Sequence, residues 1–527
     1  MDQPADLVFG AFSDDPPWVL DLDEISWTPG LDAVRAACRG EVPELTRARR
    51  IPPGWRVARV TARLGAAVAG WALFERGKGE HVSRAGISRR LRVAATDLGS
   101  TYIKLGQIIS AGEGLFPEEL VSEFKLCRDR VPAESFDTVR EVVEHDLHRP
   151  LEAVFAEFDR VPLAAASIAQ VHAAQLHTGE RVVVKVQRPQ VAKLVRQDLA
   201  AMSWLAPHLV GRIPIAALAN PPALVELFAE TITEELDFRL EAQNMLDVAR
   251  VLAELGQRGY VVPRPHPTLV TRRVLVMERL SGFAFDDVDS MKRAGIDTNA
   301  VIRTGMIAFM EGALIYGVFH GDLHAGNLFV LPDGRTALLD FGIVGRLSEP
   351  RRLAFLRLMM GATTNDVKGQ LASLRDLGAL PPDTDLDAVI RDLRLDQPPV
   401  DPTTLTGEEL VHEIQRTVKA LLGYGARMPK ELMLYVKNMV FLDGAIARLA
   451  PDLDLLAEIA TISAHFARHH GDRLAADIGI HPMDVPLDLE GVKASFGLDA
   501  STETLTYRDL QKRRELIGKR LRDRTSE

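Results

Sequence analysis

The chain has 527 residues, of which 46% are hydrophobic and 26% are charged, and its formal net charge is −10. This composition is typical of a soluble globular protein with a large hydrophobic core, and the length predicts roughly two to four domain-sized units. The acidic balance argues against nucleic acid as the main partner, because binding to a phosphate backbone requires a basic face. The two cysteines, Cys38 and Cys127, are too few for a disulfide framework or a structural zinc site. They predict reduced thiols in a cytoplasmic compartment.

Residues 1–55 are rich in Pro, Asp and Arg and predict a loosely ordered lead-in with short helical pieces. Residues 56–74 have a helical period, with apolar residues on one stripe and Arg56, Arg59 and Arg63 on another. This pattern predicts a basic amphipathic helix that either packs on the protein's own surface or lies on a membrane. No stretch reaches the roughly 18 uncharged apolar residues of a membrane-spanning helix, so we predict none.

Residues 162–167 (PLAAAS) lie where a conventional kinase has a glycine-rich turn over the phosphates. This segment has Ala164, Ala165, Ala166 and Ser167 and no glycine. Alanine cannot approach phosphates as closely as glycine, although its backbone N–H groups can still point at them. We therefore predict that these four residues contribute to a nucleotide site of altered geometry.

Residues 181–186 (RVVVKV) are β-branched and predict the second strand of a hairpin with residues 167–174. Lys185 follows three valines, the context in which a kinase lysine reaches the α- and β-phosphates. Its partner should be an acid on a helix that follows. Both Glu235 and Glu241 fit, and composition does not choose between them.

Residues 274–278 predict a further short strand, after which Glu278 and Leu280 are expected to offer backbone contacts to adenine.

The segment His320–Asn327 (HGDLHAGN) is followed by two short predicted strands, 328–331 and 336–339, and then by Asp340-Phe341-Gly342. Phosphoryl transfer needs metal ions across the phosphates and a carboxylate near the attacking hydroxyl. Asp322 is interpreted as that carboxylate, and Asn327 and Asp340 as the Mg²⁺ ligands.

These patterns predict an α+β fold with the two-lobed arrangement of protein kinases. They divide the chain into a variable segment with the amphipathic helix (1–80), a helical extension (81–160), a β-rich lobe (161–280), a helical lobe (281–450) and a C-terminal helical region (451–527).

Together these motifs resemble the UbiB/AarF-type atypical kinases, a family associated with ubiquinone and other isoprenoid-lipid metabolism. The resemblance rests on K-x-G-Q at Lys104–Gln107, the segment 126–132, the alanine-rich loop 164–167 and E-x-D at Glu235–Asp237. It implies that Glu241 pairs with Lys185 and that Glu235 meets Lys104. It also implies that the helical extension, with Lys104 and Gln107, covers the place where a peptide substrate would lie.

The leading hypothesis is an atypical kinase or ATPase that binds ATP with Mg²⁺ and supports ubiquinone, menaquinone or other isoprenoid-lipid metabolism. Its expected partners are ATP or ADP, an isoprenoid lipid or quinone precursor, and a membrane surface. Its expected location is the cytoplasm or the inner face of the membrane. A small-molecule phosphotransferase of the aminoglycoside-kinase type shares the pattern of residues 320–327, but it lacks K-x-G-Q and the alanine-rich loop. A third hypothesis is a nucleotide-gated lipid-binding scaffold with little phosphotransfer.

Overall fold

The computed structural model describes residues 3–47, 54–110, 117–127, 132–209, 221–363, 366–397, 420, 423–426, 429–479, 488–495, 498–499 and 501–523. The chain forms two compact units, each built from segments that are discontinuous in sequence. The first unit comprises residues 1–254, 261–281 and 337–343, and the second comprises residues 255–260, 282–336 and 344–527.

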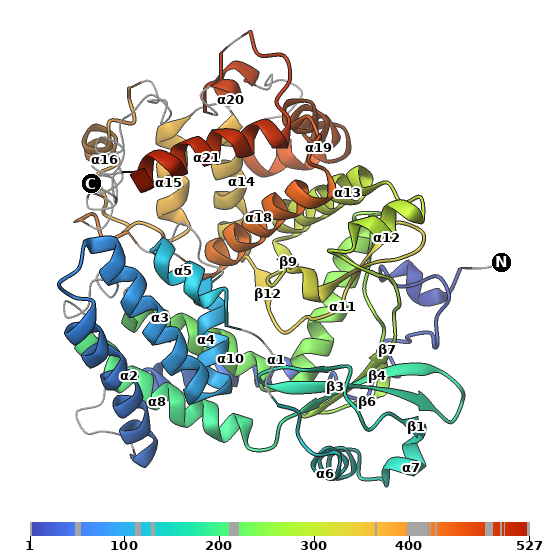
Figure 1. The fold of residues 1–527 in the computed structure, drawn as a ribbon. Coiled ribbons are helices and arrows are strands. Elements are labelled where there is room, and N and C mark those ends of the chain that lie inside the picture. Colours follow the sequence, from blue (N-terminus) through green and yellow to red (C-terminus); the bar gives the residue numbers. More distant parts are fainter. Residues whose placement is uncertain are drawn as a thin grey trace. The chain divides into compact units, whose positions relative to one another are not determined.

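The first unit contains a six-stranded antiparallel sheet in the order β1-β3-β4-β7-β6, with β2 also paired to β3 (Figure 1). Its strands are β1 (Phe155–Phe158), β2 (Ala164–Ala165), β3 (Ala169–Leu176), β4 (Arg181–Gln187), β6 (Pro265–Val270) and β7 (Val274–Glu278). The predicted hairpin and the predicted strand at 274–278 are therefore confirmed. In β4, Val182, Val184 and Val186 are at most 2% exposed and pack in one cluster with valines of α6 (Phe136–Leu147). Because side chains alternate along a strand, Lys185 points to the opposite face.

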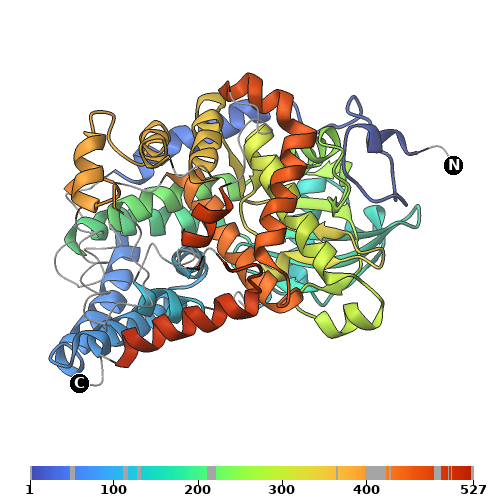
Figure 2. The same ribbon diagram turned by 90° about the horizontal axis from the view of Figure 1, so that it is seen from above.

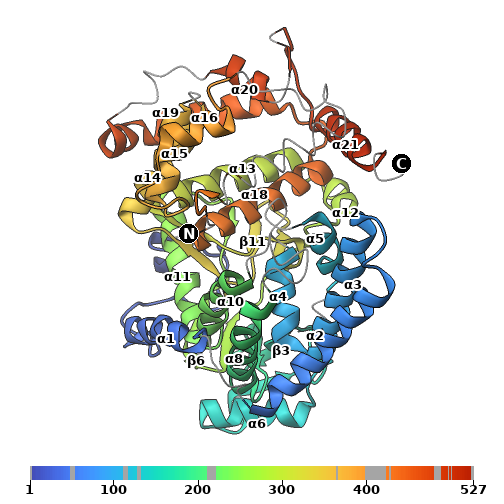
Figure 3. The same ribbon diagram turned by 90° about the vertical axis from the view of Figure 1, so that its left-hand side faces the viewer.

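The helices of the first unit form a separate layer in which α2, α3, α4, α5, α8 and α10 lie side by side (Figures 1 and 3). Their bounds are α1 (Leu31–Leu45), α2 (Gly54–Phe74), α3 (Glu80–Leu98), α4 (Ser100–Ser110), α5 (Glu118–Phe124), α7 (Leu151–Val154), α8 (Val191–Leu209), α10 (Pro221–Glu235) and α11 (Phe238–Glu254). The predicted helical extension is thus present, although residues 128–131 of the family-like segment 126–132 lie outside the described residues.

Helix α2 packs on α3 and α8, and its arginines do not form a continuous basic face. Arg56 is 5% exposed, and its guanidinium lies 2.6 Å from the Asp198 carboxylate, while Arg63 pairs with Asp97 at 3.2 Å. Trp55 and Phe74 are exposed at the two ends of the helix. Among the described residues, α2 is the one helix long and apolar enough to cross a membrane by length and composition. Because α2 contains Arg56, Arg59 and Arg63, it is not a stretch of about 18 uncharged residues and does not contradict the expectation that none occurs.

The expectation of a loosely ordered lead-in is wrong, because residues 3–47 pack closely on the first unit. After a 3₁₀ turn (η1, Ala5–Val8), the N–H of Ala11 donates to the carbonyl of Ala249, and the carbonyl of Ala11 accepts from the N–H of Val262, both at 2.9 Å. Asp6 is fully buried and forms an ion pair of 2.5 Å with Arg264, which is itself fully buried. A buried arginine requires such a carboxylate, so the segment supplies charge as well as apolar surface.

The second unit is mainly helical, and α13 and α18 lie side by side in it (Figures 1 and 3). Its helices are α12 (Val288–Arg293), α13 (Thr298–Glu311), a π-helical turn η2 (Gly312–Tyr316), a 3₁₀ turn η3 (Ala325–Asn327), α14 (Glu349–Thr363), α15 (Val367–Asp376), α16 (Leu386–Leu393), α18 (Lys430–Leu449), α19 (Leu455–Ile478), α20 (Leu489–Ser495) and α21 (Tyr507–Asp523). Figure 2 shows α18 to α21 in orange to red.

Short strands complete the second unit. Strand β8 (Phe283–Ala284) pairs with β10 (Leu328–Val330), and β9 (Val318–His320) pairs with β12 (Val344–Arg346). The chain passes between the two units at β5 (Tyr260–Val261) and β11 (Thr336–Leu338). Strands β11 and β10 are neighbours in a sheet of order β5-β11-β10-β8, which confirms the predicted strand pair after the HGDLHAGN segment.

Candidate active site

The first unit brings together Lys185, Glu241 and Asp340. The Nζ atom of Lys185 donates to both carboxylate oxygens of Glu241, at 2.7 and 2.9 Å, and to Oδ2 of Asp340 at 3.3 Å. Lys185 is placed by the alternation of β4, and Glu241 lies in the first turn of α11. The Asp340 side chain is 43% exposed, whereas the Glu241 side chain is 5% exposed. The lysine is therefore held by a buried acid and reaches a second, accessible one.

The pKa values of Lys185 and Glu241 are both raised, but for different reasons. Burial by itself would lower the pKa of Lys185, but the carboxylates of Asp340 and Glu241 outweigh burial and raise it above its ordinary value. Burial raises the pKa of Glu241 to about 7, against the lowering effect of Lys185. Asp340 adds to this rise because it is a neighbouring negative charge. Lys185 consequently remains a cation at neutral pH.

Lys104 on α4 forms a second ion pair, with Glu235 at the end of α10, at 3.1 Å. Both side chains are largely buried, at 15% and 9% exposed. Glu235 also borders the Asp340 segment, because a Cβ added at Gly342 would lie 3.5 Å from its Cγ. Composition could not decide whether Glu235 or Glu241 pairs with Lys185. In the structure Glu241 pairs with Lys185, and Glu235 pairs with Lys104.

Gly106, between Lys104 and Gln107, has a packing role. A Cβ at this position would lie 2.6 Å from Cδ1 of Phe124 and 3.3 Å from Sγ of Cys127. Only glycine lets α4 approach α5 this closely. Gln107 lies one turn after Lys104 and is half-buried.

The alanine-rich segment is a short strand and not an open loop. Ala164 and Ala165 pair with Val171 and Gln170 of β3, and the N–H of Ala166 donates to the carbonyl of Ala169 at 2.8 Å. This bond already uses the Ala166 donor that was expected to point at phosphate. Ser167, in the turn, is 3% exposed.

Arg188 holds this turn in place, and no motif in the sequence indicated this role. Its Nε donates to the carbonyl of Ala166 at 3.0 Å, and its Nη1 forms an ion pair with Glu134 at 2.8 Å. The backbone N–H of Glu134 in turn donates to the side chain of Gln170 at 2.8 Å. The position of the alanine-rich segment therefore depends on residues before and after the hairpin.

Glu278 ends β7 and is 5% exposed, and Leu280 follows it in a half-buried position. The Glu278 N–H donates to the carbonyl of Arg264 at 2.9 Å, so its carbonyl is the backbone group that a base could use. Its side chain accepts from the Arg264 backbone N–H at 3.1 Å and from the Ser13 hydroxyl. The carboxylate of Glu278 is thus part of the buried Asp6–Arg264 network.

The second unit carries Asp322 and Asn327. The amide nitrogen of Asn327 donates to the backbone carbonyl of Asp322 at 3.1 Å, so its amide oxygen is the atom that could bind a cation. The Asp322 carboxylate forms an ion pair with Lys437 of α18. The next residue, Asn438, is fully buried; it accepts from the N–H of Leu323 at 3.0 Å and donates to the carbonyl of His320. Helix α18 therefore fixes the Asp322 loop through two adjacent side chains.

Comparisons with known proteins identify this arrangement. The ABC1 atypical kinase-like domain matches residues 126–374. An uncharacterized protein of Mycobacterium tuberculosis is 35% identical over 388 residues, which cover 72% of this chain and 78% of that protein. The probable protein kinase UbiB of Marinobacter nauticus is 32% identical over 74% of this chain and 70% of its own length. The chain belongs to the ABC1/UbiB family of atypical kinases.

An Arabidopsis thaliana aarF domain-containing protein kinase, described as uncharacterized and chloroplastic, is 33% identical over 70% of this chain and 73% of its own length. Membership of the family confirms the predicted kinase-like α+β fold and the phosphotransferase class of the enzyme. The roles of the individual ABC1/UbiB-type site residues remain predictions.

Proposed function

We propose that the chain binds ATP with Mg²⁺, transfers or hydrolyses the γ-phosphoryl group, and thereby supports isoprenoid-lipid metabolism, such as the formation of a quinone. The observation that carries the nucleotide part is the Lys185–Glu241–Asp340 cluster. A lysine held by a buried acid presents a fixed positive charge, which suits the α- and β-phosphates of a nucleotide. Asp340 beside it is accessible, so a metal ion that arrives with a nucleotide could reach it.

The donor atoms fit Mg²⁺, which prefers carboxylate and carbonyl oxygens. Asp340 offers a carboxylate in the first unit, and Asn327 offers an amide oxygen in the second. When bound, the metal would neutralise phosphate charge during transfer. Asp322 is the proposed acceptor of the proton from the attacking hydroxyl or water, and Lys437 and Asn438 would hold its loop in place.

The lipid part of the proposal rests on the resemblance to the UbiB/AarF proteins. The Lys104–Glu235 contact beside the Asp340 segment supports it, because the same resemblance implies that the K-x-G-Q helix covers the place of a peptide substrate. A small-molecule phosphotransferase would not need this helix. A nucleotide-gated scaffold would bind MgATP in the same way but would turn it over little.

The test combines nucleotide binding with turnover. Thermal shift should show stabilisation of the wild type by MgATP, and Asp340→Asn should lose most of it because a charge is removed at a hard-cation site. Asp333→Asn, which changes an exposed aspartate in the β10–β11 turn, is the matched control. ATP hydrolysis should rise when an isoprenoid phenol is added. Absence of MgATP stabilisation in the wild type would reject the proposal, and binding without turnover would favour the scaffold.

A further inference from the structure

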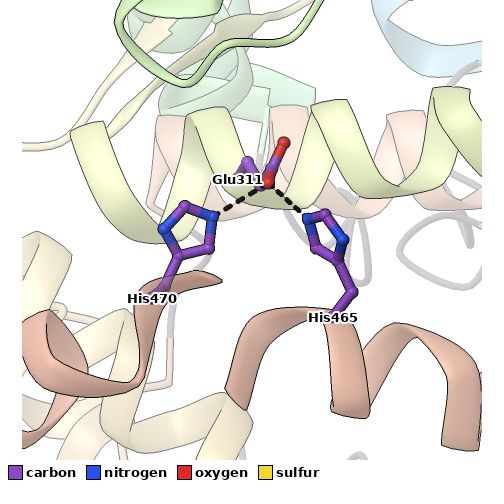
Figure 4. A group of neighbouring side chains, drawn as sticks. All are labelled: Glu311, His465 and His470. Carbon is purple, nitrogen blue, oxygen red and sulfur yellow. Dashed lines mark hydrogen bonds and ion pairs between the residues drawn. The ribbon is translucent and has the colours of Figure 1, made fainter. Parts of the chain in front are cut away.

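A carboxylate and two imidazoles converge in the second unit, away from the motifs discussed so far. Glu311 is the last residue of α13, and His465 and His470 both lie on α19. Their Nε2 atoms are 2.7 and 2.9 Å from the same oxygen, Oε1 of Glu311 (Figure 4). One ligand atom from each of the three residues can be chosen so that all lie within 4.8 Å of one another. Glu311 is 3% exposed at the side chain, and the imidazoles are 24% and 11% exposed.

The other oxygen of Glu311 is oriented separately. Nε2 of Gln257 lies 3.4 Å from Oε2, and the N–H of Gly259 donates to the amide oxygen of Gln257 at 2.9 Å. The amide of Gln257 is therefore fixed, and Oε1 is directed at the two rings. Ligating carboxylates in metal sites are commonly held in this way by a further hydrogen bond.

We propose that Glu311, His465 and His470 bind one divalent transition-metal ion, for which Zn²⁺ is the best match. Two imidazole nitrogens and one carboxylate oxygen are a known zinc donor set, in which water takes the fourth position. Bonds of about 2.0–2.1 Å in tetrahedral geometry separate neighbouring ligand atoms by roughly 3.3–3.5 Å, so the two Glu–His contacts would open by about 0.5 Å. Mg²⁺ and Ca²⁺ prefer oxygen ligands, which makes this site different in kind from Asp340 and Asn327.

The position of the cluster suggests what the metal would brace. Glu311 directly precedes the π-helical turn Gly312–Tyr316, which leads through β9 to Asp322. Helix α19 holds this turn a second time, because Arg473 donates to the carbonyl of Ile315 at 2.7 Å and lies over the ring of Tyr316. Such π turns are frequent at functional sites. A metal at Glu311 would fasten α19 to the segment that precedes the Asp322 loop.

Arg352 of α14 also links α19 to the π-helical turn Gly312–Tyr316. It donates to the carbonyl of Leu314 at 2.9 Å and forms an ion pair with Asp477 of α19 at 2.8 Å. Since these contacts hold the turn without a metal, loss of the ion is expected to loosen the segment and leave the second unit folded.

The experiment uses the untagged, full-length protein after treatment with a chelator. Titration with Zn²⁺ against a chromophoric competitor should give one tight site per chain. His465→Ala and His470→Ala should each lower the affinity for Zn²⁺ by more than about 100-fold, since mutation of a residue that only hydrogen-bonds to a metal ligand already lowers metal affinity by about 10–100-fold. His469→Ala is the matched control, because His469 lies on the same helix and stacks on His465 at 4.2 Å but is not one of the three ligands. The affinity of His469→Ala for Zn²⁺ should equal that of the wild type.

Co²⁺ gives a readout on the wild type that does not depend on a folded variant. It should produce the visible absorption of four- or five-coordinate cobalt, and added Zn²⁺ should remove that absorption. A folded wild type that takes up neither Zn²⁺ nor Co²⁺ at micromolar concentration would overturn the proposal and leave a hydrogen-bonded cluster. Unchanged zinc affinity in folded His465→Ala and His470→Ala would also overturn it, because the metal would then bind elsewhere.

Discussion

Lys104→Ala tests whether the K-x-G-Q helix is fastened through a charge. The Lys104–Glu235 contact is 3.1 Å long, and its side chains are 15% and 9% exposed. Breaking a fully buried pair costs about 3–5 kcal/mol, whereas an exposed pair contributes at most about 1 kcal/mol. A contact of intermediate burial should therefore lower the free energy of unfolding by about 2 kcal/mol. Most of this loss comes from the Glu235 carboxylate, which is left without Lys104 beside other negative charges.

Urea unfolding followed by tryptophan fluorescence measures this loss selectively, because all five tryptophans lie in the first unit. Arg63→Ala is the control, since Arg63 also joins two helices of that unit through an ion pair, with Asp97, but the side chains are 54% and 44% exposed. This variant should lower the free energy of unfolding by less than about 1 kcal/mol.

A double variant separates the charge effect from simple loss of packing. Lys104→Ala combined with Glu235→Gln removes the uncompensated carboxylate, so about half of the lost stability should return. Equal losses of stability in Lys104→Ala and Arg63→Ala, or strictly additive effects of the two substitutions at 104 and 235, would show that Lys104 does not hold the helix through its charge.

Three further predictions follow from other contacts. Asp6→Asn should lower the free energy of unfolding of the first unit by about 3 kcal/mol in urea, because Arg264 would stay buried after losing its closest carboxylate and would keep the longer, 3.3 Å ion pair with Glu278, whereas exposed Asp15→Asn should change little. Burial lowers the pKa of His266 from 6.5 to about 4, so the unfolded chain takes up this proton first as pH falls. Between pH 6.5 and 4 the wild type should then lose up to about 3 kcal/mol more stability than His266→Gln, which equilibrium unfolding of both proteins at a series of pH values would show. Lys437→Met should reduce ATP turnover by about tenfold or more and leave MgATP binding intact, since Lys437 contacts Asp322; exposed Lys512→Met should change neither quantity.

Sequence reasoning succeeded where the signal was local. The alternation of apolar residues in β4 places Lys185 opposite Val182, Val184 and Val186, and the structure has this alternation. The choice between Glu235 and Glu241 is different, because both lie in one acidic stretch. The chain turns at Leu236–Asp237 between α10 and α11, and this turn sends the two carboxylates to different lysines. Only the family resemblance predicted that outcome.

Contacts between residues far apart in sequence could not be predicted. Asp6 and Arg264 each resemble an ordinary surface charge, and only the fold buries them together. Lys437 and Asn438 lie in an amphipathic helix more than 100 residues after the loop that they hold, with no motif around them. In both cases the residue types are common, and the information lies in the tertiary pairing.

The charges around Lys104 and Lys185 give a physical reason why the proposed nucleotide site would need a metal ion. Lys104 and Lys185 face Glu235, Glu241 and Asp340, so the negative charges outnumber the positive ones. A free nucleotide would bring further negative charge to this cluster, which opposes binding. A divalent cation bound to Asp340 would reverse the balance, and Lys185 could then attract phosphate. Since Asp340 is the accessible acid and Glu241 the buried one, the exposed carboxylate can hold the ion while the buried carboxylate keeps the lysine in place.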